Sequence, residues 1–290
     1  MVSNELLILI MILAVGIGFI ASLFGIGGGF LLYPTMIFIA QMDVHSTVGT
    51  IPFVILFMAL SSSIAYGRQK RIDYLIVAIL AGASTIGAIL GAYTSVQIPG
   101  QILVILFGIV EIILALILGL MKSPHEKQNK SKNEMIIEGN DLQGRKKWYI
   151  ISRKKVDAQG QEFVYNANII YSIPLSFAAG FLSSMLGIGG GSLYIPIYVF
   201  LCGMSIHMAI ACSIFSIFIS MISSSITFII LGEVNYIVGI TITIGMIIGA
   251  QIGAFTAKKI KSRYLKLMAA IMMTIIAIQM ILFAIFGKPT

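Results

Sequence analysis

The amino-acid sequence predicts an all-α polytopic membrane protein made of two inverted four-segment repeats, each opening with a glycine-broken helical hairpin. Composition is the first reason: 58% of the 290 residues are hydrophobic and 10% are charged, whereas a soluble domain carries about 25% charged residues. The second is length, because uncharged runs such as 6–42 and 163–232 exceed the ~20 residues that cross a bilayer. The third is that one pattern of glycines, serines and a proline occurs twice.

Turns and charged residues divide the chain into apolar segments, all expected to be helical because open sheet edges cannot face lipid. The segments lie at residues 6–41, 46–66, 74–96, 101–121, 168–206, 208–231, 236–257 and 265–286. A polar stretch separates the fourth segment from the fifth. We therefore expect an N-terminal transmembrane repeat (1–121), a cytoplasmic linker or insert (122–167) and a C-terminal transmembrane repeat (168–290).

Lysine and arginine gather in three loops, around 68–71, 122–155 and 258–266, with Lys288 as the exception. The positive-inside rule places these loops in the cytoplasm and both termini outside, in a multi-pass protein of the cell (plasma) membrane. This topology accounts for the net charge of +8, so no nucleic-acid partner is expected. Residues Met1–Glu5 contain no basic residue, so we expect the first apolar run to remain in the mature protein.

The first apolar segment is too long to be one straight helix. Its 36 residues, 6–41, would span about 54 Å against a hydrocarbon thickness of about 30 Å. Gly25–Gly29 interrupts the run with the sequence GIGGG, and Pro34 follows. Glycine clusters and proline both interrupt helices. The segment is therefore predicted to form two helical arms around a glycine elbow.

The same construction occurs 162 residues later, where GIGGG stands at 187–191 and a proline at 196. The charge pattern starts the first half outside and the second half inside, so the two are predicted to be inverted repeats. In secondary transporters, inverted repeats place a site near the membrane midplane and rock to open it to each side in turn. Small-residue ladders in the third segments let helices approach closely; they are Ala83, Gly87 and Gly91, and Gly245, Gly249 and Gly253.

Each elbow is a candidate anion site. Where the chain re-enters a helix, the first N–H groups have no intrahelical partner and carry partial positive charge, and glycine lets a ligand approach them. The alternative is that the glycines only permit a tight bend. The candidate substrate-binding residues are Gly27, Gly28, Gly29 and Phe30 with Gly189, Gly190, Gly191 and Ser192, and nearby donors Ser22, Ser184, Thr50, Cys212 and Ser213.

The two elbows resemble those of the sulfite exporter TauE/SafE family. The residues that carry the resemblance are GIGGGFLLYP (25–34) and GIGGGSLYIP (187–196), each followed by a small polar patch, HSTVGT (45–50) or HMAIACS (207–213). The resemblance covers both halves but not residues 122–167. It implies a transporter, usually an exporter, of small sulfur-containing anions such as sulfite, sulfoacetate or other organosulfonates. The second copy departs from the first in having Ala211 and Cys212 in place of Gly49 and Thr50.

Glu111 is the acidic residue deepest in an apolar run. An ionisable group there is costly, so it is either a proton carrier or a neutral, hydrogen-bonded carboxyl that ties helices together. A negative cell interior drives each negative charge outward by about 2.3 kcal/mol per 100 mV. Export of an anion therefore needs no coupling ion.

Other classes of protein are weighed by the groups they need. The histidines at 45, 125 and 207 are scattered, and Cys202 and Cys212 lack ligand-like spacing, so we expect no enzyme, metal or cofactor. His45 and His207 are equivalent and serve either in gating or as interfacial caps. An anion channel, or a membrane subunit that supports a partner protein, is the alternative to a transporter. The expected partners are a small anionic substrate and the lipid bilayer; a homo-oligomer is left open, and residues 148–151 are either an interfacial docking patch or part of a linker.

Overall fold

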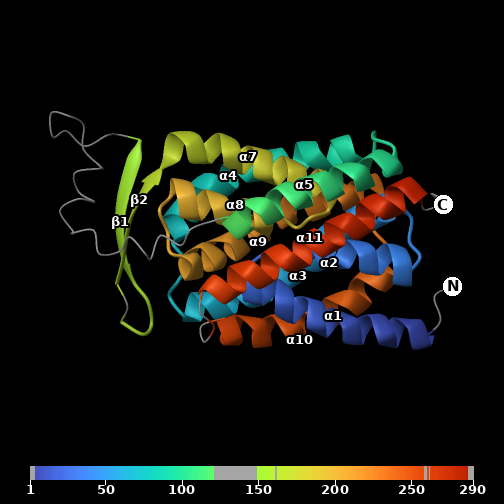
Figure 1. The fold of residues 1–290 in the computed structure, drawn as a ribbon, viewed down its shortest axis with the longest axis horizontal. Coiled ribbons are helices and arrows are strands. Elements are labelled where there is room, and N and C mark those ends of the chain that lie inside the picture. Colours follow the sequence, from blue (N-terminus) through green and yellow to red (C-terminus); the bar gives the residue numbers. More distant parts are fainter. Residues whose placement is uncertain (1–3, 121–148, 161, 258–259, 261, 287–290) are drawn as a thin grey trace.

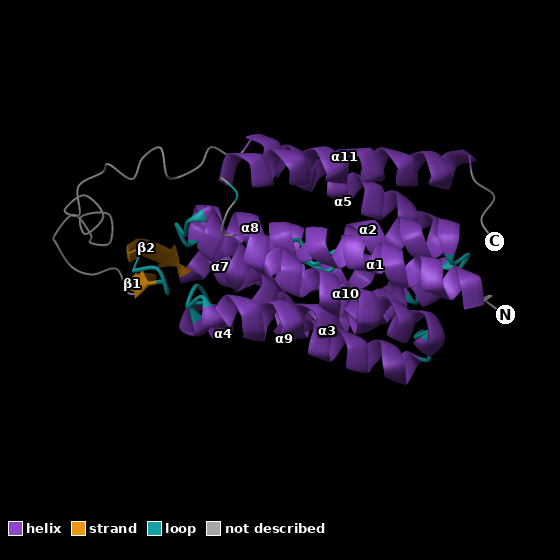
Figure 2. Ribbon diagram, turned by 90° about the horizontal axis from the view of Figure 1, so that it is seen from below, coloured by secondary structure: helices purple, strands orange, loops and turns teal. Residues whose placement is uncertain are grey.

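The structure is a computed structural model that describes residues 4–120, 149–160, 162–257, 260 and 262–286. Within these residues, eight helices are long and apolar enough to cross a membrane. They lie side by side in one elongated bundle (Figures 1 and 2). Large apolar side chains remain exposed along most of them, as expected for surfaces that face lipid. The predicted all-α polytopic membrane fold is confirmed.

The N-terminal half begins with α1 and a short helix that turns back from it. The elements are α1 (Asn4–Phe24), α2 (Gly29–Pro34), the π-helical turn η1 (Thr35–Ile39), α3 (Val44–Arg68), α4 (Tyr74–Ser95) and α5 (Gly100–Leu120). The C-terminal half follows the same order. Its elements are α7 (Ile169–Leu186), α8 (Gly191–Pro196), the π-helical turn η3 (Ile197–Leu201), α9 (Ile206–Leu231), α10 (Tyr236–Ala257) and α11 (Ser262–Phe286).

The long first segment of each half breaks where the glycines predict. In the first elbow Gly25, Gly27 and Gly28 have φ angles of 72°, 89° and 82°. The equivalent glycines of the second elbow also have positive φ. Because L-residues with side chains rarely adopt this region, glycine is required here. Each short arm then widens into its π-helical turn directly after a proline, whose missing N–H cannot continue the α-helical pattern.

The four main helix pairings each join one half to the other: α1 with α10, α4 with α7, α3 with α9, and α5 with α11. The predicted small-residue ladders lie inside the first two. A Cβ atom added to Gly249 would lie 1.9 Å from the carbonyl oxygen of Val15, and one added to Gly87 would lie 2.1 Å from that of Phe177. Only glycine allows backbones to come this close. The ladders therefore act as close-packing surfaces.

Corresponding helices of the two halves start at opposite ends of the bundle. Helix α1 starts at the end that holds both chain termini, whereas α7 starts at the other end (Figure 1). The contacts between the halves correspond as well, since Gly249 is equivalent to Gly87 and Val15 to Phe177. This arrangement is compatible with the predicted inverted repeats.

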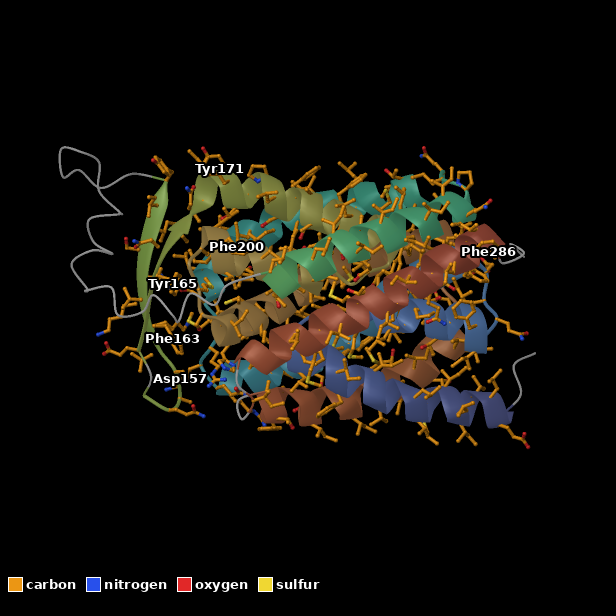
Figure 3. The ribbon with its side chains drawn as sticks, viewed as in Figure 1. Asp157, Phe163, Tyr165, Tyr171, Phe200 and Phe286 are labelled. Atoms are coloured by element: carbon orange, nitrogen blue, oxygen red, sulfur yellow. The ribbon has the colours of Figure 1, made fainter. Side chains whose placement is uncertain are left out.

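A β-hairpin, which the sequence reading does not anticipate, covers the end of the bundle away from the termini (Figure 3). Strands β1 (Ile150–Val156) and β2 (Glu162–Asn168) pair antiparallel. Alternate side chains of β2 are buried, namely Phe163, Tyr165 and Ala167, which is the pattern of a strand with one covered face. Residues 121–148, most of the predicted linker, lie outside the described residues. Of the predicted interfacial docking patch at 148–151, Ile150 and Ile151 belong to β1.

Candidate functional site

The two glycine elbows contact each other directly inside the bundle. A Cβ atom added to Gly29 would lie 2.2 Å from the carbonyl oxygen of Ile188, and one added to Gly191 would lie 2.2 Å from that of Gly25. Between them, a Cβ on Gly27 would lie 2.7 Å from the carbonyl oxygen of Gly189. Since these neighbours are backbone atoms, no side chain fits between the elbows. The structure thus brings together the glycines that the sequence singles out.

Each elbow carries backbone donors without partners. In the first, the helical bonds begin with Leu31 N–H, which donates to Gly28 at 3.0 Å. Among the described residues, the N–H groups of Gly28, Gly29 and Phe30 donate no hydrogen bond. The second elbow repeats this pattern at Gly190, Gly191 and Ser192. Buried N–H groups are nearly always paired, so two unpaired sets in contact form a polar region with donors to offer.

The second elbow adds two buried hydroxyls that have no hydrogen-bond partner in the described structure, on Ser183 and Ser192. The hydroxyl of Ser183 lies against Gly190, 2.8 Å from where its Cβ would be. The equivalent residues of the first elbow are Ala21 and Phe30. The second elbow therefore offers two hydroxyl donors that the first elbow lacks at the equivalent positions. Ser183 is not among the site residues predicted from the sequence. The signal that indicates it is the difference between the repeats at this position, where the second has Ser183 and the first has Ala21.

Three other predicted residues already take part in internal hydrogen bonds. The hydroxyl of Ser62 donates to that of Ser22 at 2.9 Å. The equivalent pair, Ser184 and Ser224, lies at 2.6 Å. The hydroxyl of Ser213 donates to the carbonyl oxygen of Gly25 at 2.9 Å. These bonds attach the first long helix of each half to the second, and α9 to the first elbow.

Thr50 and Cys212 hold the starts of two helices. The backbone N–H of Asn235 donates to the hydroxyl of Thr50 at 2.9 Å, just before α10. At the equivalent place before α4, the N–H of Asp73 donates to the sulfur of Cys212 at 3.4 Å. The departure of the second repeat from the first thus replaces oxygen with sulfur in a matching contact. These bonds direct Thr50 and Cys212 to the starts of α10 and α4, and not to the unpaired N–H groups of the elbows.

Glu111 is fully buried on α5, and neither of its carboxyl oxygens has a hydrogen-bond partner in the described structure. The ring of Tyr33 stacks on Phe107, one helical turn earlier, with ring centroids 4.4 Å apart, and the Tyr33 hydroxyl is also unpaired. A carboxyl that ties helices together would form hydrogen bonds with a neighbouring helix. The structure therefore leaves Glu111 available for a different partner.

The larger described pockets lie at the two ends of the bundle. One, of about 180 Å³, is lined by Asp43, His45 and Gln101 near the start of α3. Another, of about 260 Å³, is lined by Arg68, Arg71 and Asp157 at the hairpin end. A much smaller space of about 10 Å³ lies beside Ile26. None of these three is lined by the elbow glycines. Residues 27–30 and 189–192, which carry the elbow donors, are buried in this conformation.

Eight membrane-crossing helices and two broken helices that meet in the interior define a multi-pass membrane protein of the transporter type. A family model described as "Sulfite exporter TauE/SafE" matches residues 10–280. The chain belongs to this family. As a member it is a membrane transporter.

Similar proteins carry matching descriptions. The chain is 29% identical to "Probable membrane transporter protein YunE" of Bacillus subtilis, covering 97% of this chain and 99% of that one. It is 26% identical to "Probable membrane transporter protein ORF9" of Sinorhizobium sp, covering 91% and 88%. It is 25% identical to "Probable membrane transporter protein MJ0441" of Methanocaldococcus jannaschii, covering 96% and 97%. No solved structure matches the chain.

Proposed function

We propose that this transporter moves small anions such as sulfite, sulfoacetate or other organosulfonates, and that the paired elbows are its binding site. The observation that carries this is the set of unpaired donors: the N–H groups of both elbows and the hydroxyls of Ser183 and Ser192. An anion with several oxygens would satisfy them together, because N–H and O–H donors are strongest toward ionised acceptors. The family's description as a sulfite exporter supports the substrate class.

Neutral donors suit a site that must release its ligand. No Lys or Arg lies in α1, α2, α7 or α8, so the anion would be held by dipoles and hydroxyls rather than by a fixed charge. Such sites at helix starts bind anions through partial charges. The bound anion can then leave without breaking an ion pair.

Alternating access follows from the contact between elbows of different halves. In the closed conformation the backbones touch, as Gly29 and Ile188 do. Separation of the elbows toward one end or the other would expose the donors to the corresponding side. We place the hairpin end in the cytoplasm and the termini outside, because the described basic residues Arg68, Arg71 and Arg153 lie at the hairpin end. Outward movement of an anion is then favoured by the membrane potential.

Glu111 is our candidate for proton coupling. It is buried and unpaired, and an isolated intramembrane carboxyl is a proton carrier in many pumps and transporters. Its equivalent in the second half is Met273, also buried. Proton exchange at Glu111 would allow uptake as well as export.

Transport by purified protein in proteoliposomes tests the proposal. Sulfite, sulfoacetate, taurine, sulfate and chloride are offered in turn, and both saturation and counterflow are measured. We expect saturable counterflow of at least one sulfur-containing anion. Ohmic anion current without counterflow would establish a channel instead. Absence of both, with the protein folded, would leave the role of a membrane subunit for a partner protein and overturn the proposal.

A further inference from the structure

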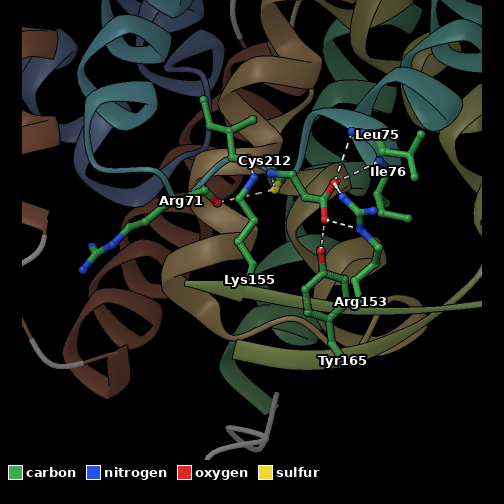
Figure 4. Close-up of polar contacts among 9 residues, drawn as sticks. Arg71, Leu75, Ile76, Arg153, Lys155, Tyr165 and Cys212 are labelled. Carbon is green, nitrogen blue, oxygen red and sulfur yellow. Dashed lines mark hydrogen bonds and ion pairs between the residues drawn. The ribbon is translucent and has the colours of Figure 1, made fainter. Parts of the chain in front are cut away.

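The β-hairpin is fastened to the end of the bundle by several polar contacts. The N–H of Ala158 donates to the carbonyl oxygen of Gln69 at 3.1 Å. The ammonium group of Lys155 donates to the carbonyl oxygen of Ile72 at 2.5 Å. Both acceptors belong to the turn between α3 and α4. The hairpin is therefore docked on the chain reversal that leads into α4 (Figure 4).

Asp73 is the centre of the docking surface, which is the turn between α3 and α4 that the hairpin contacts. Its carboxylate is fully buried and accepts hydrogen bonds from Arg153 at 3.1 and 3.3 Å and from the hydroxyl of Tyr165. It also accepts from the N–H groups of Leu75 and Ile76 and so caps α4. One side chain thus joins both strands of the hairpin to the start of a membrane-spanning helix (Figure 4).

Arg153 and Asp73 form an ion pair in which both side chains are charged at neutral pH. Burial alone raises the pKa of the Asp73 carboxyl, but the hydrogen bonds from Tyr165 and Arg153 outweigh burial and hold this pKa below its usual value. The hydrogen bond to Asp73 raises the pKa of Arg153. Removing one partner of a buried pair leaves an uncompensated charge. Release of the hairpin from Asp73 therefore costs free energy. The cost is limited because the Arg153 side chain is partly exposed to solvent.

The docking surface is connected to the first elbow. Asp73 N–H donates to Cys212, and the next residue, Ser213, donates to Gly25 of the elbow. At the opposite end of the bundle the equivalent of Asp73 is Asn235, whose side chain accepts from Val238 N–H. Asn235 carries no charge and takes part in no ion pair within the described residues. Within the described residues, the ion pair that holds the start of a helix is therefore found at the hairpin end and not at the equivalent place at the opposite end.

We propose that the β1–β2 hairpin is a gate, closed by the contacts of Arg153 and Tyr165 with Asp73, and that solutes reach the elbows from this end only when the contacts break. This inference rests on the proposed transport function for its purpose, but the opening can be measured without any transported solute. Lids that close a site commonly move between such discrete docked and undocked positions.

Cys212 is a built-in reporter of opening. It lies fully buried beneath the hairpin, and the other cysteine, Cys202, can be removed as Cys202→Ser. In this background a membrane-impermeant maleimide is added from each side in turn, and labelling of Cys212 is followed by mass spectrometry. We expect slow labelling from the hairpin side. Arg153→Gln should accelerate it at least tenfold. Lys154→Gln is the matched control, because the neighbouring ion pair of Lys154 with Glu162 is about half exposed on both sides.

A locked hairpin separates a gate from a static cover. Gln69→Cys with Ala158→Cys is introduced, since these backbones are hydrogen-bonded. Oxidation to the disulfide should lower Cys212 labelling at least tenfold and stop counterflow of sulfoacetate, both reversibly with dithiothreitol. Sulfoacetate is used here because sulfite would cleave the disulfide. Lys154→Cys with Val164→Cys, which face each other within the hairpin, should change neither.

Equal labelling of Cys212 in the locked and unlocked protein would overturn the gate. So would labelling in Arg153→Gln no faster than in Lys154→Gln. If no anion is transported by the parent protein, the transport proposal fails while the labelling result still decides whether the hairpin opens.

Discussion

The backbone N–H of Asp73 donates a hydrogen bond to the sulfur of Cys212, and 162 residues further on the N–H of Asn235 donates to the hydroxyl of Thr50. Each bond crosses from one half to the other and holds the start of a helix. Sulfur is a weak acceptor and hydroxyl oxygen a good one. The bond to Thr50 should therefore contribute more to stability than the bond to Cys212.

Removing these acceptors should destabilise the protein unequally. Thr50→Val leaves Asn235 N–H unpaired and should lower the free energy of unfolding by about 1–3 kcal/mol. Cys212→Ala should cost less, whereas Cys212→Thr should restore a strong acceptor and be neutral or stabilising. Thermal unfolding in detergent measures the order. A larger loss for Cys212→Ala than for Thr50→Val would show that packing, not hydrogen bonding, governs this contact.

Alanine at the contacting elbow positions should disrupt the centre of the bundle. In Gly29→Ala and Gly191→Ala the added methyl group would lie 2.2 Å from a backbone carbonyl oxygen of the other elbow, which is too close. Gly16→Ala is the control, because its added Cβ meets nothing within 4 Å. We expect the control to match the parent and both elbow variants to unfold at lower temperature. Elbow variants as stable as Gly16→Ala would mean that the elbows are apart in the membrane.

The unpaired hydroxyls should matter for binding rather than for folding. Ser183→Ala and Ser192→Ala remove donors that have no internal partner, so stability should stay the same or rise. Each should weaken anion binding about tenfold, equivalent to about 1.4 kcal/mol, as measured by the concentration dependence of counterflow. Ser95→Ala is the control, since its hydroxyl bonds within its own helix, to Ala92. Full affinity in Ser183→Ala with Ser192→Ala would remove the second elbow from the site.

Glu111 should be costly for stability. Glu111→Met copies the residue at the equivalent position of the other half, Met273, and should raise the free energy of unfolding by about 1–3 kcal/mol, because a buried unpaired polar group is removed. Glu111→Gln should abolish any dependence of transport on a proton gradient. The proton role is refuted by a Glu111→Gln protein whose transport keeps the pH dependence of the parent.

Docking of the hairpin should be insensitive to pH between about 5 and 9. The pKa of Asp73 is lowered in the folded protein, so its contribution is present above the unfolded value of about 3.9 and lost only as pH falls through the folded one. Burial and Asp73 raise the pKa of Tyr165, so its contribution persists below about 10. The pKa of Arg153 is raised by its hydrogen bond to Asp73, so Arg153 stays charged, and Lys155 donates to Ile72 in the turn before Asp73. Hydrogen exchange of residues 150–168, corrected for intrinsic rates, should show no loosening in this window.

Sequence patterns predict the parts of this protein that lipid constrains. The bounds of α10, Tyr236–Ala257, coincide with the expected segment because charge and turn residues mark both ends. The elbows follow from a segment too long for the bilayer and from glycines that interrupt it. In each case a single rule of length or backbone freedom decides the local structure.

Features that depend on contacts between distant residues could not be predicted in this way. The hairpin lies beyond the ends of the membrane-crossing helices, where the rule that excludes open strands in lipid does not decide the structure. It is held by a contact between Asp73 and Tyr165, 92 residues away. The roles of Thr50 and Cys212 likewise depend on backbone groups in the opposite half. Whether a hydroxyl is paired, as in Ser184, or unpaired, as in Ser183, is decided by packing and not by its neighbours in the chain.

The pairing of every main helix with one from the opposite half has a consequence for biosynthesis. Helices α1 and α4 leave the ribosome long before α10 and α7 are made, so glycine-lined grooves such as the one at Gly87 must wait in the bilayer for their partners. Neither half should survive alone for long in a cell that degrades unassembled membrane segments. The two halves produced as separate polypeptides should protect each other from proteolysis only when they are synthesised together.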